Sequence, residues 1–151
     1  VADMPVGTED LFPTLVGLAG GQDCGTPGHN FAPFLRGAAA PDRDGVVLQF
    51  VTETRPGRGY YDETWRGIRT KRYKYTVLGD RSGAKPWQLF DLQADPYERD
   101  NLIADPDAAL IAAEHHEKLS LLLTKTCDDY ALAAAFDVAG QNCVSIEPDG
   151  L

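Results

Sequence analysis

The stretch from Trp65 to Leu102 constrains the fold of this chain most strongly, because it reads as a small β-sheet closed by a turn. Within it, β-branched and aromatic residues alternate with polar ones in short runs, and this period of two is typical of strands. The predicted strands are residues 65–70, 73–78 and 88–92. The sheet should stop at Asp95-Pro96, since proline cannot donate to a ladder and biases the residue before it toward an extended or turn conformation.

Short connections between the predicted strands indicate antiparallel neighbours. Lys71-Arg72 is a tight polar link, and residues 79–86, rich in Gly, Ser, Asp and Pro, should form a loop. A parallel return would need a crossover of about a dozen residues or more. A further strand is expected at residues 46–52 (VVLQFVT), whose nearly continuous apolar character suits a strand covered on both faces or the central strand of the sheet.

One helix is predicted on each side of this sheet in the sequence. Residues 8–10 (TED) look like a capped helix start, and residues 20–21 (GG) like its end. The second helix starts with Asp105 as a cap and Pro106 in the first helical position, and its apolar face should pack across the sheet. The apolar positions of the first helix are Leu11, Phe12, Leu15, Val16, Leu18 and Ala19, and those of the second face are Ala108, Ile111, Ala112, His115, Leu119 and Leu122.

Length and composition limit the class of protein. The 151 residues fit one ordinary domain or a part of a larger one, and a hydrophobic content of 43% suffices for a core. No apolar run approaches the roughly 20 residues of a membrane span. Val1 opens in the middle of a pattern with no signal peptide, so we expect the chain to be a fragment of a longer protein. A formal charge of -9 argues against nucleic acid as a partner.

Half of the 14 basic residues lie between positions 55 and 74. A local cationic patch on an acidic protein suits a small anionic substrate rather than a polymer. The alternative is that these side chains line the solvated face of the sheet and discourage edge pairing. The residues are Arg55, Arg58, Arg66, Arg69, Lys71, Arg72 and Lys74.

Four sequence pieces carry a family resemblance. They are R-G-I-R-T-x-R-Y-K-Y at 66–75, L-F-D-L-x-x-D-P-x-E-x-x-N-L at 89–102, D-L-F-P-T-L-V-G-L-A-G at 10–20 and F-x-P-F-L-R-G at 31–37. In this order and spacing they resemble the C-terminal subdomain of the sulfatases, the formylglycine-dependent group of the alkaline-phosphatase-like superfamily. The similarity covers about residues 8 to 125. One such motif would be weak evidence for the family, but four motifs in the family's order are strong evidence.

The resemblance implies an α+β fold. We expect a small antiparallel sheet of about four strands packed by a C-terminal helix, preceded by one helix that belongs to the α/β sulfatase core. The expected division is residues 1–44 for the end of that core with a connecting loop, 45–126 for the C-terminal subdomain, and 127–151 for a tail. The first helix packs on the α/β core in sulfatases, so its apolar stripe should be exposed in this chain.

The resemblance also implies a function. The parent protein would be a sulfuric ester hydrolase, and its substrate would be the sulfate ester of a carbohydrate or of another small molecule. Its Ca²⁺ and formylglycine would lie outside this chain, and the 151 residues alone should be inactive. The alternatives are a phosphatase or phosphodiesterase of the same superfamily, or a non-catalytic module that binds anionic sugars. A secreted or periplasmic location is expected.

The candidate substrate-binding residues lie in the Gly-rich loop that precedes the second strand. Aromatic side chains stack on sugar faces, and arginine binds a sulfate or carboxylate with two parallel hydrogen bonds. In sulfatases, loops of this small sheet face the active-site cleft; an ordinary surface loop is the alternative. The candidates are Arg55, Arg58, Tyr60, Tyr61 and Trp65.

No catalytic or metal-binding residue is assigned within the chain. His115 and His116 are adjacent on a helix and point about 100° apart, so they cannot chelate one ion; His115 should be partly buried and His116 at the surface. The acids of residues 91–100 lack the EF-hand spacing and should instead hold a structural turn together with Asn101.

Three cysteines remain. Cys127 and Cys143 bracket the tail, and secreted bacterial sulfatases often end in a similar pair, which implies a disulfide that would contribute roughly 3 kcal/mol. Two unpaired thiols are the alternative. Cys24 is left over and should be a free thiol. None of the three lies in a C-x-P-x-R element, the sequence in which sulfatases form their nucleophile.

Overall fold

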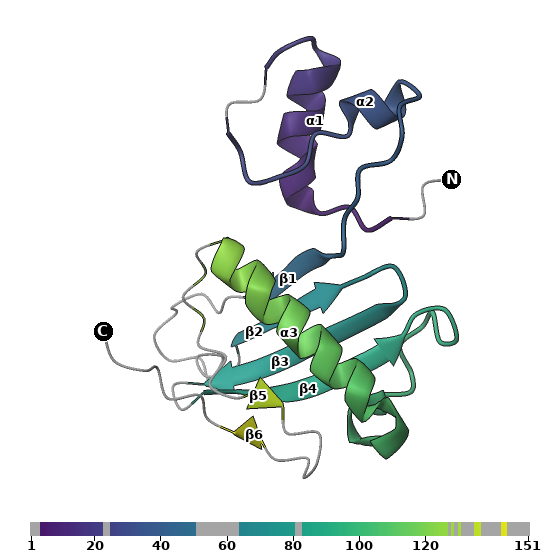
Figure 1. Ribbon diagram of the computed structural model, residues 1–151, viewed down its shortest axis with the longest axis vertical. Coiled ribbons are helices and arrows are strands. Elements are labelled where there is room, and N and C mark those ends of the chain that lie inside the picture. The colour runs from purple at the N-terminus through teal and green to yellow at the C-terminus, as the bar shows by residue number, and fades with distance from the viewer. Residues whose placement is uncertain are drawn as a thin grey trace, which may run out of the picture. The chain divides into compact units, whose positions relative to one another are not determined.

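The computed structural model describes residues 4–22, 25–50, 64–80, 83–126, 128, 130, 135–136 and 143–144. They belong to two compact units, Val1–Val46 and Val47–Leu151, whose elements are labelled in Figure 1. None of the described helices combines the length and the apolar character that crossing a membrane requires.

The first unit is held together by one buried carboxylate. A 3₁₀ turn (Thr8–Asp10) leads into α1 (Leu11–Leu18), and α2 (Ala32–Leu35) follows after a loop. Asp10 accepts hydrogen bonds from the backbone N–H groups of Gly7 (2.7 Å) and His29 (2.8 Å) and pairs with Arg43. Burial acts to raise the pKa of Asp10, but these donors outweigh it and hold the pKa below its ordinary value. One side chain thereby joins the helix start to the long loop.

The start and end of α1 follow the predicted positions. The helical region starts at residue 8, and Gly20 ends it with a positive φ of 81°, a conformation that glycine adopts without steric cost. The apolar stripe is exposed, as expected: Leu11, Phe12 and Leu15 are 57–63% exposed. Nothing in the described part of the first unit covers this face of α1.

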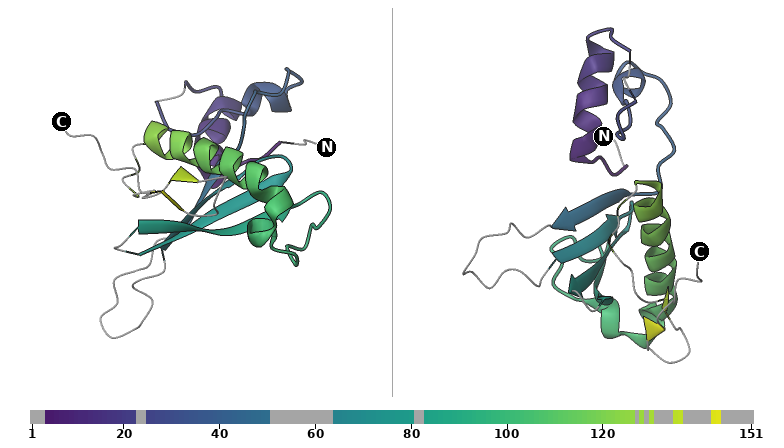
Figure 2. Two further views of the ribbon diagram at one scale, coloured as in Figure 1. Left: turned by 60° about the horizontal axis from the view of Figure 1, so that its bottom comes forward. Right: turned by 90° about the vertical axis from the view of Figure 1, so that its left-hand side faces the viewer.

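The second unit contains the predicted small sheet. Its strands are β1 (Val46–Phe50), β2 (Thr64–Arg69), β3 (Tyr73–Asp80) and β4 (Gly83–Asp91), in the spatial order β1-β2-β3-β4. β2 pairs with β3, and β3 with β4, in antiparallel register. Figure 2 shows the sheet edge-on with one long helix against one face. The predicted α+β class is confirmed.

Two predictions about the strands are wrong. Most of residues 79–86 are strand rather than loop, because β3 continues to Asp80 and β4 begins at Gly83. β4 lies at the edge of the sheet, where Pro86 is tolerated beside a bulge in the register opposite Thr76 and Val77. The expected strand at 46–52 is described as far as Phe50, and it lies at the other edge rather than in the centre. Burial decreases along β1, from the buried Val46 to the exposed Phe50.

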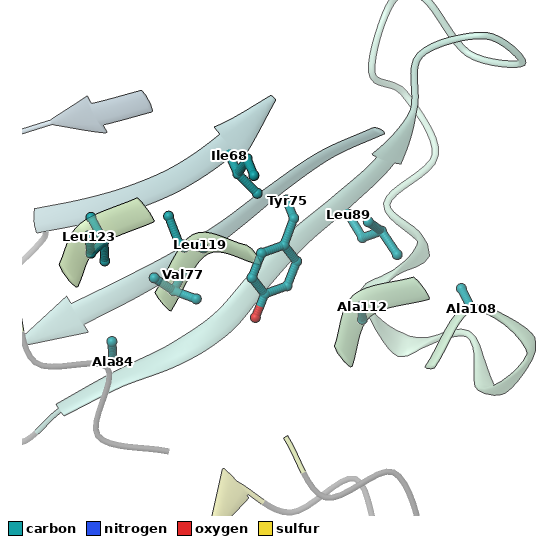
Figure 3. Close-up of a cluster of buried hydrophobic side chains, with 9 residues drawn as sticks. All are labelled: Ile68, Tyr75, Val77, Ala84, Leu89, Ala108, Ala112, Leu119 and Leu123. Atoms are coloured by element: carbon teal, nitrogen blue, oxygen red, sulfur yellow. The ribbon is translucent and has the colours of Figure 1, made fainter. Parts of the chain in front are cut away.

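The core of the second unit lies between the sheet and α3 (Ala109–Lys125). Asp105 caps the preceding 3₁₀ turn (Pro106–Ala108) by accepting from the N–H of Asp107 at 3.0 Å, as its predicted role requires. The cluster in Figure 3 joins strand residues to the helix and comprises Ile68, Tyr75, Val77, Ala84, Leu89, Ala108, Ala112, Leu119 and Leu123. The predicted packing of the helix across the sheet is therefore confirmed.

Residues 91–100, which we call the carboxylate turn, begin at the end of β4, and Asn101 after them covers the edge of that strand. The sheet ends at Asp91, and a second 3₁₀ turn (Leu102–Ala104) follows. The side-chain amide of Asn101 accepts from the N–H of Leu89 (3.0 Å) and donates to the carbonyl of Trp87 (3.0 Å), as a neighbouring strand would. A two-stranded ladder, β5 (Ala135–Phe136) with β6 (Cys143–Val144), belongs to the same unit.

Candidate substrate-binding surface

The predicted substrate-binding residues are only partly described. Arg55, Arg58, Tyr60 and Tyr61 lie outside the described residues. Trp65 lies in β2, half-buried, and its ring stacks on that of Phe50 at the end of β1, with the centroids 6.4 Å apart and the planes 13° from parallel. The end of β1 and the start of β2 therefore lie side by side.

Most of the described basic residues in the predicted cationic patch have acidic partners. Arg66 binds Asp128 (Nε–Oδ2 2.7 Å), and Arg72 binds Asp91 (Nη2–Oδ2 2.7 Å). Lys74 pairs with Glu98, which sits at a φ of +55° in the carboxylate turn. Arg69 is different: it is exposed, and no described residue pairs with it.

These pairs fix the charge of their carboxylates. Hydrogen bonds from Arg72 lower the pKa of Asp91 against an opposing effect of burial, and the N–H groups of Gln93 and Ala94 add to the lowering. The hydrogen bonds from Arg66 likewise lower the pKa of Asp128. No sequence pattern predicts the pairing of Arg66 with Asp128, because the two residues are 62 positions apart.

A cluster around Tyr130 holds the first residue of β2. The Tyr130 hydroxyl donates to the carbonyl of Thr64 (3.0 Å), and the Arg66 guanidinium lies 4.5 Å from the centre of the Tyr130 ring. Asp128 accepts from the N–H of Tyr130 at 2.9 Å and so links the ion pair to the aromatic ring. A Cβ at Gly79 would lie 2.0 Å from the Tyr130 oxygen, so that position in β3 has no room for a side chain.

The two adjacent histidines of α3 both contact the sheet. His115 is buried, as expected, with Nδ1 2.8 Å from the Ile111 carbonyl and Nε2 3.3 Å from Thr70 Oγ1. The prediction that His116 lies at the surface is wrong: it is 7% exposed, and its Nδ1 is 2.9 Å from the Tyr75 hydroxyl. Burial lowers the pKa of His115.

The described residues contain no group of three or more His, Cys, Asp or Glu side chains that could hold a metal ion. The acids of residues 91–100 instead bind backbone, as predicted: Asp95 Oδ2 accepts from the N–H groups of Arg99 and Asp100, the latter at 2.9 Å. These ligand types therefore do not form a Ca²⁺ site in the part of the chain that is described.

The predicted disulfide lies outside what the structure describes. Cys24 and Cys127 are not among the described residues, and only the backbone of Cys143 is described, in β6. The Cys127–Cys143 pair and the free Cys24 stay predictions.

A comparison with protein families identifies most of the chain. The family model described as N-sulphoglucosamine sulphohydrolase, C-terminal, matches residues 2–125. A curated relative, the Delta 4,5-hexuronate-2-O-sulfatase of Bacteroides thetaiotaomicron, is 37% identical over 124 residues, which cover 82% of this chain and 24% of the relative.

Solved structures agree with the family match. A 2-O GAG sulfatase has a TM-score of 0.68 and 36% identity, covering 80% of this chain and 25% of that one. The phosphonate monoester hydrolase of Agrobacterium radiobacter has a TM-score of 0.63 and 28% identity, covering 92% of this chain and 28% of that one. The chain thus spans about a quarter of the length of the proteins it matches.

Proposed function

The chain belongs to the sulfatases, as a member of the N-sulphoglucosamine sulphohydrolase C-terminal family, and from that premise we propose that it is the C-terminal part of an enzyme hydrolysing sulfate esters on carbohydrate. The match of residues 2–125 to the C-terminal family carries the proposal. The two similar proteins are a Delta 4,5-hexuronate-2-O-sulfatase and a 2-O GAG sulfatase, and both names support a sugar as the sulfate carrier.

The cofactors that the family implies do not fit this chain. Cys24 is followed by Gly-Thr-Pro, Cys127 by Asp-Asp and Cys143 by Val-Ser, so none can become a formylglycine within C-x-P-x-R. No group of three potential ligands exists among the described side chains. Formylglycine and Ca²⁺ would therefore belong to the N-terminal part of the enzyme, and this chain would complete the fold and shape the substrate cleft.

The loop before β2 is the proposed part of that cleft. Arg55 and Arg58 would bind a sulfate or carboxylate, while Tyr60, Tyr61 and Trp65 would stack on sugar rings. The stacked pair of Phe50 and Trp65 at the base of the loop supports this assignment, because it keeps an aromatic surface next to the loop.

Replacing both arginines of the loop tests the assignment. In the full-length enzyme, the double variant R55A/R58A should lower kcat/KM for a sulfated disaccharide about tenfold or more, as expected for lost charge-assisted hydrogen bonds. K125A, which removes one exposed charge at the end of α3, is the control. Unchanged kcat/KM in R55A/R58A across sulfated sugars would reject the loop as a substrate site.

The reaction class has a sharp test. The full-length enzyme should hydrolyse an aryl sulfate and a 2-O-sulfated disaccharide, and the isolated 151 residues should hydrolyse neither. Turnover by the isolated chain would refute the proposed division of labour.

A second candidate function is a phosphoryl or phosphonyl esterase of the same superfamily, and the similarity to a phosphonate monoester hydrolase supports it. Faster turnover of an aryl phosphonate monoester than of the aryl sulfate would select it.

The location and the tail complete the proposal. We place the enzyme outside the cytoplasm, secreted or periplasmic, where a Cys127–Cys143 disulfide would persist and pin residues 127–151. Residues 1–44 would then be the end of the catalytic core and residues 45–126 the C-terminal subdomain. Mass spectrometry without reduction tests the disulfide, and free thiols at both positions would exclude it.

A further inference from the structure

The sheet has a second face that α3 does not cover. Side chains alternate along a strand, so Ile68, in the core cluster beneath α3, fixes which face its neighbours share. In β2, Trp65, Gly67 and Arg69 point away from α3. Their register partners in β3 are Leu78, Thr76 and Lys74. We call this side of the sheet, opposite α3, the outer face.

One end of the outer face is aromatic. Trp65 stacks almost parallel on Phe50, and Phe50 is 49% exposed. Leu78 lies directly across from Trp65. A partly exposed aromatic pair is a surface on which the apolar face of a sugar ring can stack.

The other end of the outer face is cationic. Arg69 is exposed and has no partner among the described residues, whereas Arg66, Arg72 and Lys74 each bind a carboxylate. Lys74 lies across from Arg69 in the register. The unpaired guanidinium keeps its planar array of donors available for a sulfate or a carboxylate.

The two ends are separated by a position without a side chain. Trp65 and Arg69 are four residues apart in one strand, which places their Cα atoms about 13 Å apart. Gly67 lies between them, and a Cβ there would be 2.8 Å from Thr76 Cγ2 and from the Tyr75 carbonyl oxygen. No side chain of β2 on this face therefore stands between the aromatic pair and the guanidinium.

We propose that the outer face is a binding site for one unit of an anionic oligosaccharide, with its ring stacked on the Phe50–Trp65 pair and a sulfate or carboxylate bound by Arg69. A sulfated sugar as the ligand rests on the proposed function. A chain of net charge -9 whose Arg69 has no carboxylate partner among the described residues fits a ligand with separated charges better than the dense phosphates of nucleic acid. The substrate would then be an oligosaccharide that extends from the cleft onto this face.

Binding to the 151-residue chain tests the site without catalysis. The probe is a 2-O-sulfated, uronic-acid-containing tetrasaccharide, followed by calorimetry and by ¹⁵N–¹H NMR shifts. R69A should weaken binding about tenfold through lost charge-assisted hydrogen bonds, and R69K should fall in between because lysine keeps only the charge. W65L should also weaken binding, with circular dichroism confirming that both variants are folded.

Matched measurements decide between specific and general attraction. K125A also removes one positive charge, at the end of α3, and should leave the affinity unchanged. Equal weakening by K125A and R69A would overturn the site. The unsulfated tetrasaccharide should bind more weakly than the sulfated one. No shifts at residues 65–69, or unaltered affinity in R69A, would also overturn it.

The full-length enzyme separates this inference from the proposed function. R69A should raise KM for the tetrasaccharide about tenfold while kcat and the turnover of a small aryl sulfate stay unchanged. An enzyme without sulfatase activity whose C-terminal chain still binds the tetrasaccharide through Arg69 would refute the proposed function and keep the outer-face site. An active enzyme with normal KM in R69A would do the reverse.

Discussion

The buried side chain of His115 makes the second unit sensitive to acid. His115 lies between α3 and the sheet, where its ring meets Tyr73 edge to face at 5.2 Å and its Nδ1 is 2.8 Å from a helix carbonyl. Burial lowers the pKa of His115, so the unfolded chain takes up a proton at a higher pH than the folded chain does. The stabilising effect is fully present above the ordinary value of 6.5 and is lost as the pH falls below it.

We therefore predict that the second unit loses stability between pH 7.5 and 5.5. The slope from one such group is at most about 1.4 kcal/mol per pH unit, and H115Q should reduce it while keeping a donor for the Ile111 carbonyl. Both tryptophans of the chain, Trp65 and Trp87, lie in β2 and β4, so urea unfolding followed by fluorescence reports this unit. H29Q in the first unit is the control, and an equal slope in H115Q and the wild type would contradict the prediction.

The pairing of charges explains why single residues of the site were hard to predict. The basic residues at 66, 72 and 74 looked alike in the sequence, yet each meets a carboxylate 62, 19 or 24 residues away. Only the folded chain brings these partners together, so Arg69 becomes distinct from its neighbours only in the structure. The prediction for His116 is wrong for a related reason. The buried side of α3 includes both histidines, and it is wider than the stripe that the apolar residues alone define.

At the scale of the helices and strands, β4 relies on the side chain of Asn101 for hydrogen bonds along the edge that no other strand covers. Asn101 satisfies the Leu89 N–H, the Trp87 carbonyl and the Ile103 N–H at once, with distances of 3.0, 3.0 and 3.2 Å. Leu89 is fully buried, so its N–H would find no water if the amide were removed. An exposed strand edge is also a site of association between chains.

N101A should destabilise the second unit by about 1–3 kcal/mol, the cost of leaving a buried N–H without a partner. Urea unfolding measures the change, and sedimentation shows whether the uncovered edge promotes dimers. N101D keeps the acceptor and loses the donor, so it should fall between N101A and the wild type. A value for N101A within 0.5 kcal/mol of the wild type, roughly the range of neutral surface changes, would contradict this role.

The strands themselves were readable from the sequence because a period of two survives in β2, β3 and the end of β4. The start of β4 was missed because Gly and Pro usually mark loops, and Pro86 is acceptable only in an edge strand with a bulge. The apolar run at residues 46–52 suits a strand covered on both faces or a central strand, because apolar content does not reveal which neighbours cover a strand. Phe50 is in fact exposed at the edge.

For the chain as a whole, the exposed apolar stripe of α1 is a surface that favours association. Leu11, Phe12 and Leu15 present adjacent apolar surface, and patches of this kind mark interfaces or cause association. We expect the isolated chain to bind a hydrophobic dye and to self-associate as its concentration rises. In the full-length enzyme this stripe would pack on the catalytic core, as the proposed function requires.

L15E should reduce both dye binding and self-association of the isolated chain without unfolding it, because Leu15 is 63% exposed. L110E is the matched control, since Leu110 is 71% exposed on α3, and it should change neither. Dye fluorescence and sedimentation velocity measure the effects. Equal effects of L15E and L110E would show that general charge, not the stripe, governs association.

The order of the sheet has a consequence for how the second unit acquires its structure. β2, β3 and β4 follow one another in space as they do along the chain, and α3 comes soon after them and covers them. The β2–β3 and β3–β4 pairings therefore join residues close in sequence, and local contacts of this kind are associated with fast folding. We expect β2, β3 and β4 to form their hairpins and to pack under α3 early, which would make them a folding nucleus for the longer protein.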